Sequence, residues 1–239
     1  MSNTKKNFDE FTWQTRVMPV LVTITPLFFS AIAKGFSAPA WTETGLMAGI
    51  MVIVLSLLYR LARDRGKACE KKITRCLGAM PSVIILRFSD STIGFISKQR
   101  YHQRLNDVYK LNLPLDAATE KAEDDAQYDA AIRSLKNRAN CNRDTEFRVY
   151  QELREYHFFR NLYGIKPIAI CMYFALAIRE MWLIPNFNVK VLFLNPIPDY
   201  ISFLIFSFGI LLSFLVTRKG VEERSFSYAK ALVESCERI

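Results

Sequence analysis

The sequence predicts a mainly α-helical membrane protein in which four transmembrane helices, arranged as two hairpins, flank a cytosolic, mostly helical domain. Four apolar stretches lead to this prediction, and they occur as two pairs, at 17–33 and 45–59 and at 167–183 and 201–217. Each is close to the ~20 residues that cross a bilayer. Residues 50–59 and 203–216 are apolar all round, whereas a surface helix of a soluble protein has a polar face.

The composition leaves room for one polar domain between the two pairs, because 51% of the 239 residues are hydrophobic and 23% are charged. We expect a cytosolic interfacial segment, a transmembrane hairpin, a cytosolic basic helical domain, a second hairpin and a cytosolic C-terminal helix, at 1–16, 17–62, 63–164, 165–217 and 218–239. A cleaved signal peptide is the alternative for the first stretch. A second apolar stretch follows so soon that a hairpin is favoured.

The basic residues orient the predicted spans. Of 32 lysines and arginines, only Lys34, Arg179 and Lys190 fall in or near the two hairpin connections. Because lysine and arginine resist translocation, the basic segments, including both ends of the sequence, are expected on the cytoplasmic side. Trp41 and Trp182 stand at the outer ends of spans, where amphipathic rings prefer the headgroup level.

Two features within the spans are candidates for function or packing. The charged pair Arg179 and Glu180 lies in the third span, and charges at such depth usually face protein or water, so we predict pore-lining or intramembrane polar residues. The alternative is that Arg179 reaches the outer headgroups with Glu180 as its partner. Gly45 and Gly49 form a GxxxG pattern, which permits close helix approach.

A stripe of cations follows the second span. Residues 61–77 lack proline, so the helix is expected to continue into the cytosol. Five cations recur at spacings of three, four, four and four residues, which puts them on one helical face: Arg60, Arg63, Lys67, Lys71 and Arg75. Such like charges repel by a few tenths of a kcal/mol per pair, so the stripe indicates an anionic partner. Lipid headgroups are one partner, and a polyanionic ligand that reaches beyond the ~8–10 Å Debye length is the other.

Two further segments mix basic and aromatic residues, as single-strand-binding surfaces do. Arginine binds phosphate while an aromatic ring stacks on a base, so the candidate ligand-binding residues are Arg100, Tyr101, His102 and Arg104 in 98–104, and Arg148, Arg154 and Arg160 in 148–166. The alternative, strongest for the second segment, is a helix with an aromatic core face and a solvated basic face.

Enzymatic chemistry and bound metals are not expected. No phosphate-binding glycine loop, catalytic triad or paired-carboxylate signature is present, and two histidines with five scattered cysteines give no metal-ligand spacing. No cofactor is predicted. A membrane-anchored nuclease using Arg148, Arg154 and His157 is a weaker alternative. Residues 80–87 (MPSVIILR) are interpreted as a short strand or a buried segment.

Three blocks resemble a family of small bacterial membrane proteins found beside defence genes. The blocks are GAMPSVIILR at 78–87, KQRYHQRL at 98–105 and YHFFRNLYGIKP at 156–167. The chain is similar there to the transmembrane effectors of nucleotidyltransferase-linked anti-phage systems such as Hailong. It departs from the family pattern at Ala79 and His157, where the family has glycine.

The resemblance implies a homo-oligomeric, tetrameric channel in the bacterial inner membrane. A single-stranded deoxyadenylate oligomer, made by a nucleotidyltransferase partner, would hold the channel closed. Destruction of the oligomer by a phage nuclease would release it and cause growth arrest or membrane depolarisation. The residues alone leave a second reading open, a membrane-tethered nucleic-acid-binding or interaction module without conduction.

Overall fold

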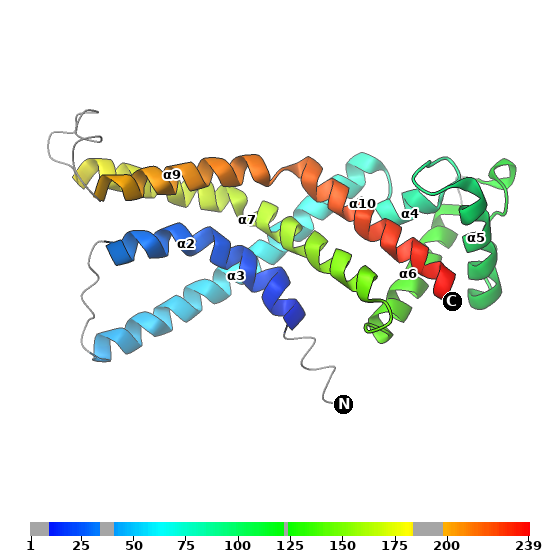
Figure 1. Cartoon of the computed structure of the whole chain (residues 1–239), viewed down its shortest axis with the longest axis horizontal. Helices are drawn as coiled ribbons and strands as arrows, with labels where there is room; N and C mark the ends of the chain where they lie inside the picture. Colours follow the sequence, from blue (N-terminus) through cyan, green and yellow to red (C-terminus); the bar gives the residue numbers. More distant parts are fainter. Residues whose placement is uncertain (1–9, 34–40, 122–123, 184–197) are drawn as a thin grey trace. The chain divides into compact units, whose positions relative to one another are not determined.

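The computed structural model describes residues 10–33, 41–121, 124–183 and 198–239 (Figure 1). The described residues form helices and no strand, so the prediction of a mainly α-helical fold is confirmed. The chain divides into two compact units, each with its own apolar core. Unit 1 comprises residues 1–69 and 157–218, and unit 2 comprises residues 70–156 and 219–239.

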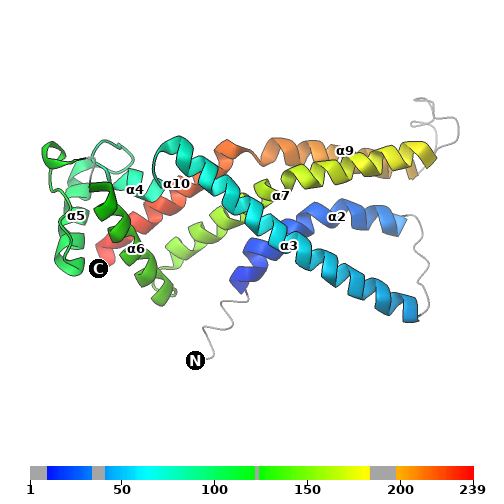
Figure 2. The same ribbon diagram turned by 180° about the vertical axis from the view of Figure 1, so that it is seen from behind.

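Unit 1 contains the four apolar stretches, and each falls on a helix. Its elements are the π-helical turn η1 (Trp13–Val17), α2 (Met18–Ala33), the first part of α3 (Trp41–Leu77), the second part of α7 (Phe147–Leu183) and α9 (Pro198–Leu215). The second part of α7 and α9 lie side by side in both views (Figures 1 and 2), and α2 packs against α9. Buried apolar side chains from these helices, such as Val20, Ile165 and Leu212, form the core of unit 1.

The apolar surface of unit 1 fits a membrane. Among the described residues, one helical segment is long and apolar enough to span a bilayer, namely Phe147–Arg179, which contains a window of 18 residues with a mean hydropathy of 1.5. Large apolar side chains also stand exposed on the neighbouring helices, including Val52 (62% exposed) on α3 and Phe214 (77%) on α9. These features support membrane association, whereas the four-span layout and its orientation stay predictions.

Two glycines allow α3 and α7 to approach closely in unit 1. A Cβ atom on Gly164 would lie 2.5 Å from the backbone nitrogen of Gly66, so only glycine fits without moving backbone. Beside this contact, Nδ2 of Asn161 donates to the carbonyl of Thr15 at 2.8 Å, which ties η1 to α7. Gly49 of the GxxxG pattern makes no such contact within the described residues, since a Cβ atom added to it would meet nothing within 4 Å. Gly45 lies where side chains are not described.

Unit 2 is built around α5, α6 and α10. Its elements are the end of α3, α4 (Pro81–Leu86), α5 (Phe95–Tyr109), the 3-10 turn η2 (Ala117–Thr119), α6 (Asp125–Cys141), the first part of α7, α10 (Arg218–Glu234) and the 3-10 turn η4 (Ser235–Arg238). Within residues 80–87, Pro81–Leu86 form α4, so a buried segment is confirmed and a strand is wrong. Pro81 presets the first turn, and Val83, Ile85 and Leu86 are buried in the core.

The unit boundaries differ from the predicted segments. The cytosolic domain was expected at 63–164 with a separate C-terminal helix at 218–239, whereas unit 2 joins 70–156 with 219–239. The physical reason is burial, because Leu232, Val233 and Cys236 at the end of the chain are inaccessible to solvent within the core of unit 2. α3 and α7 each contribute residues to both units.

We predict that Gly164→Ala destabilises unit 1. The added methyl group meets the backbone of α3 rather than the end of a flexible side chain, so the two helices must separate, at a cost of about 1–3 kcal/mol. The thermal unfolding midpoint of the full chain in detergent measures the effect. Gly49→Ala is the matched control and should be neutral or slightly stabilising, because its methyl group enters open space and alanine favours helix. Equal shifts in the two variants would contradict the proposed contact.

Candidate functional site

The basic stripe lies on α3, which runs as one helix from Trp41 to Leu77, so the expected continuation of this helix past the apolar stretch is confirmed. Lys67, Lys71 and Arg75 are exposed, and Arg63 is half-buried. In the described part of the chain, none of these four cations makes an ion pair or a side-chain hydrogen bond. Asp64 is exposed on the same helical face and offsets part of their charge. The stripe therefore has positive charge available for an external partner.

Two aromatic candidates on α5 are buried instead of exposed. The Tyr101 side chain is 3% exposed, and its hydroxyl donates to Oε1 of Glu237 at 3.0 Å. His102 is fully buried, with Nδ1 2.6 Å from the carbonyl oxygen of Pro114 and Nε2 2.9 Å from that of Leu86. Both rings make their contacts inside unit 2, so neither is exposed to stack on a nucleic-acid base.

A spacing pattern in the sequence indicates that these rings are buried. Lys98, Tyr101, His102 and Leu105 follow the spacing i, i+3, i+4, i+7 of a single helical face, and all four are buried. Lys98 is 1% exposed and its ammonium donates to the carbonyl of Arg87 at 2.5 Å and to that of Asp90. The basic and aromatic composition of this segment suggested a ligand-binding surface, whereas the spacing of these four residues is that of a buried helical face.

The other arginines of the two mixed segments differ in their surroundings. Arg100 is exposed on α5. Arg148 pairs with Glu234 at 3.1 Å, and the guanidinium of Arg154 lies 5.3 Å from the centre of the Tyr150 ring. Arg160 is buried in unit 1, and its guanidinium lies beside Oδ1 of Asn161 at 3.3–3.4 Å.

A cluster of arginines in unit 2 holds the turn η4. Arg104 donates to the carbonyl of Glu237 at 2.6 Å, and Arg138 donates to the carbonyls of Ser235 and Arg238. The buried carboxylate of Glu146 accepts hydrogen bonds from Arg238 in turn. Arginine at the end of a helix satisfies carbonyl oxygens that have no partner within the helix. Sequence reasoning assigned Arg104 to phosphate and missed this use of it.

Three further predictions concern the charged pair Arg179 and Glu180, the nuclease alternative and metal binding. Arg179 is exposed near the end of α7, and the side chain of Glu180 lies outside the described residues. The nuclease alternative stays untested, and the ring of His157 packs on that of Phe11 with the ring centres 5.6 Å apart. Within the residues that the structure describes, no three His, Cys, Asp or Glu side chains are grouped to hold a metal ion.

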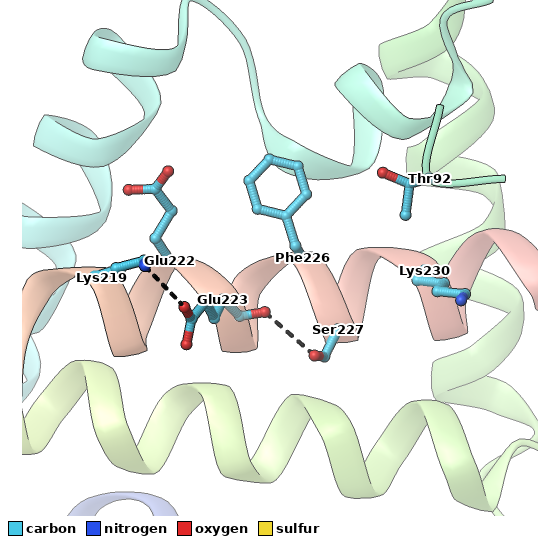
Figure 3. Close-up of a pocket in the computed structure, with 7 residues that line it drawn as sticks. All are labelled: Thr92, Lys219, Glu222, Glu223, Phe226, Ser227 and Lys230. Atoms are coloured by element: carbon cyan, nitrogen blue, oxygen red, sulfur yellow. Dashed lines mark hydrogen bonds and ion pairs between the residues drawn. The ribbon is translucent and has the colours of Figure 1, made fainter. Parts of the chain in front are cut away.

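A recess in unit 2 lies along α10, with a volume of about 350 Å³ (Figure 3). Figure 3 shows Phe226 and Glu222 projecting from the same side of α10. Lys219 lies 3.9 Å from Glu223, and the hydroxyl of Ser227 donates to the backbone carbonyl of Glu223 at 3.2 Å. Two lysines and two glutamates in the wall leave no net charge, so the recess does not select a polyanion.

We predict that His102 makes unit 2 less stable in acid. Burial lowers the pKa of His102 below its ordinary 6.5, and the two carbonyl acceptors raise it by less. A proton therefore binds the unfolded chain more tightly than the folded one, so stability falls as the pH drops below about 6.5. Denaturant midpoints measured from about pH 7 to about pH 5 should decrease, and His102→Gln should flatten this decrease. His157→Gln is the control, and an unchanged profile in His102→Gln would contradict the assignment.

Comparison of the chain with protein-family models, with curated proteins and with solved structures gives no match.

Proposed function

We propose that this chain is the subunit of an oligomeric membrane channel that is held closed by a cytosolic single-stranded oligonucleotide. α3 supports the proposal most directly. Its first part exposes apolar side chains such as Ile53 and Leu57, each 61% exposed, and its last four turns expose cations without partners in the described chain. One helix thus connects a surface suited to lipid with a surface suited to a polyanion.

The length of the stripe favours a polyanionic ligand over lipid alone. Arg63 and Arg75 are twelve residues apart, which corresponds to about 18 Å along a helix. This exceeds the ~8–10 Å Debye length over which a charged bilayer surface acts. A single-stranded nucleic acid carries phosphates along its whole length, so it can neutralise every turn of the stripe and relieve the repulsion between neighbouring cations.

The assembly and its control are part of the proposal. Several copies around an axis would bring their stripes together beneath the membrane, and a strand bound there would occlude the path of ions. We propose a homotetramer in the bacterial inner membrane, with both ends of the chain in the cytosol. A nucleotidyltransferase partner supplies a deoxyadenylate ligand, and loss of this ligand opens the channel. The apolar helix Phe147–Arg179 and the excess of basic residues outside the hairpin connections support this arrangement.

A binding measurement tests the role of the stripe. Full-length protein in detergent should bind a short deoxyadenylate oligomer with steep salt dependence, because each contacted phosphate contributes about −0.7 to the slope of log K against log salt. Lys67→Glu with Lys71→Glu removes two contacts and should reduce the steepness of that slope by about 1.4. The matched control is Arg65→Glu with Lys72→Glu, which makes the same charge change at exposed positions on another face of α3. Equal losses in both double variants would show that net charge, not the stripe, governs binding.

A cellular measurement tests the proposed channel. Expression of the chain alone should depolarise bacterial cells, and co-production of the oligomer should restore the membrane potential. Lys67→Glu with Lys71→Glu should depolarise cells whether or not the oligomer is present, because the ligand no longer binds. Normal potential at high expression of correctly inserted protein would contradict conduction and would favour the membrane-tethered binding module.

A further inference from the structure

A groove on unit 1 runs between the second part of α7 and α9, which lie side by side (Figures 1 and 2). Its volume is about 190 Å³. Exposed apolar side chains line it from both helices, such as Phe174 (60% exposed) on α7 and Phe214 (77%) on α9. All residues of its wall belong to the third or fourth apolar stretch of the sequence, so the groove faces lipid in the proposed membrane arrangement.

The two polar side chains of the wall are already satisfied, so the groove suits an apolar occupant. The hydroxyl of Ser213 donates to the carbonyl of Gly209 at 2.9 Å, and that of Tyr173 donates to the carbonyl of Thr23 at 2.6 Å. The Tyr173 ring lies against Gly209, since a Cβ atom there would be 2.9 Å from Cδ2 of the ring. Because Tyr173 is held at its ring and at its hydroxyl, this part of the wall is in place before an occupant binds.

A cation is fixed at one end of the groove. The ammonium of Lys166 donates to the carbonyls of Ser213 and Val216, at 2.8 Å each. It also lies 5.8 Å from the centre of the Tyr163 ring. Lys166 directly precedes the third apolar stretch, which begins at Pro167, so the ammonium lies at the level of the lipid headgroups in the proposed span.

The charge of Lys166 has no counter-charge within the described chain. Neutral carbonyls fix the position of the ammonium without neutralising it, and Lys166 makes no ion pair with a described residue. Lys98 in unit 2 shows the difference, since it also binds two carbonyls but has Oδ1 of Asp90 at 3.6 Å. An ammonium has three donors, so Lys166 keeps one for an anion.

The spacing between this cation and the groove matches one lipid leaflet. Ile170 and Phe174 of the wall follow Lys166 by four and eight residues, or about 6 and 12 Å along α7. Half of a ~30 Å hydrocarbon core is about 15 Å. A lipid whose headgroup lies beside Lys166 would therefore place an acyl chain along the groove within a single leaflet.

The charges of the chain favour lipid over a second copy as the occupant. Across the four apolar stretches, the only acidic residue is Glu180, about 21 Å along α7 from Lys166. A neighbouring subunit with the same orientation in the membrane would therefore meet the ammonium with apolar side chains, and an uncompensated charge there is costly. The phosphate of a headgroup supplies both the opposite charge and acceptor oxygens.

We propose that the groove between α7 and α9 binds one acyl chain of an anionic phospholipid, and that the headgroup phosphate of this lipid pairs with the ammonium of Lys166. The site rests on the membrane location of unit 1. It does not depend on conduction or on the oligonucleotide, because the stripe on α3 takes no part in it.

Native mass spectrometry of the full-length protein in detergent counts bound lipids and tests the headgroup contact. Lys166→Gln should weaken the binding of phosphatidylglycerol about fivefold, the contribution of one cation near a headgroup, and should change the binding of zwitterionic phosphatidylcholine little. Glutamine keeps an N–H donor for the carbonyls of α9 but has no charge. Lys166→Arg keeps the charge and should preserve binding. Lys72→Gln is the matched control, because it removes an exposed cation of α3 outside the groove.

A second pair of variants tests the groove itself. Ile210→Trp places a larger side chain in the wall and should remove the bound lipid at concentrations where the wild type retains one, whichever headgroup the lipid carries. Leu211→Trp is the matched control, since Leu211 is 52% exposed on α9 outside the wall, and it should bind lipid as the wild type does.

Three results would overturn the lipid site while leaving the proposed function intact. One is equal affinity for phosphatidylglycerol in the wild type and Lys166→Gln. Another is equal lipid binding in Ile210→Trp and Leu211→Trp, which decides alone if Lys166→Gln lowers the unfolding midpoint. The third is a changed oligomeric state in Ile210→Trp with lipid binding unchanged, which would assign the groove to a second copy of the chain.

Discussion

The requirement that α3 suit two environments is the constraint on which the rest of the structure depends. Its first part exposes apolar side chains that water does not solvate well, and its last part exposes cations that a hydrocarbon interior would not accept. In the proposed membrane arrangement, α3 meets both demands because it crosses from lipid to water. In unit 1, its close contact with α7 at Gly66 and Gly164 fixes where the helices pack.

The distribution of satisfied and unsatisfied charge separates structural cations from candidates for function. Arg104, Arg138 and Arg148 have carbonyl or carboxylate partners in unit 2, and Lys98 donates to two backbone carbonyls. The stripe on α3 has no such partners in the described chain. Cations with internal partners contribute to folding, whereas those without them retain charge for a ligand.

Sequence reasoning reached the features that depend on local pattern. Hydropathy located the four helices of unit 1, and the absence of proline in 61–77 predicted a continuous α3. Features that depend on which helices pack against one another were not predicted. Tyr101 was predicted to stack on a nucleic-acid base, but a tyrosine ring packs equally well in a protein core. The overlooked signal was its four-residue spacing from Leu105, which places both side chains on one buried helical face.

Ion flux from liposomes that contain the purified full-length protein tests the central claim most directly. The account predicts flux without ligand, suppression of that flux by a short deoxyadenylate oligomer, and no suppression after Lys67→Glu with Lys71→Glu. Flux that the oligomer leaves unchanged would contradict control through the stripe. No flux from correctly inserted protein, with or without the oligomer, would contradict the channel itself.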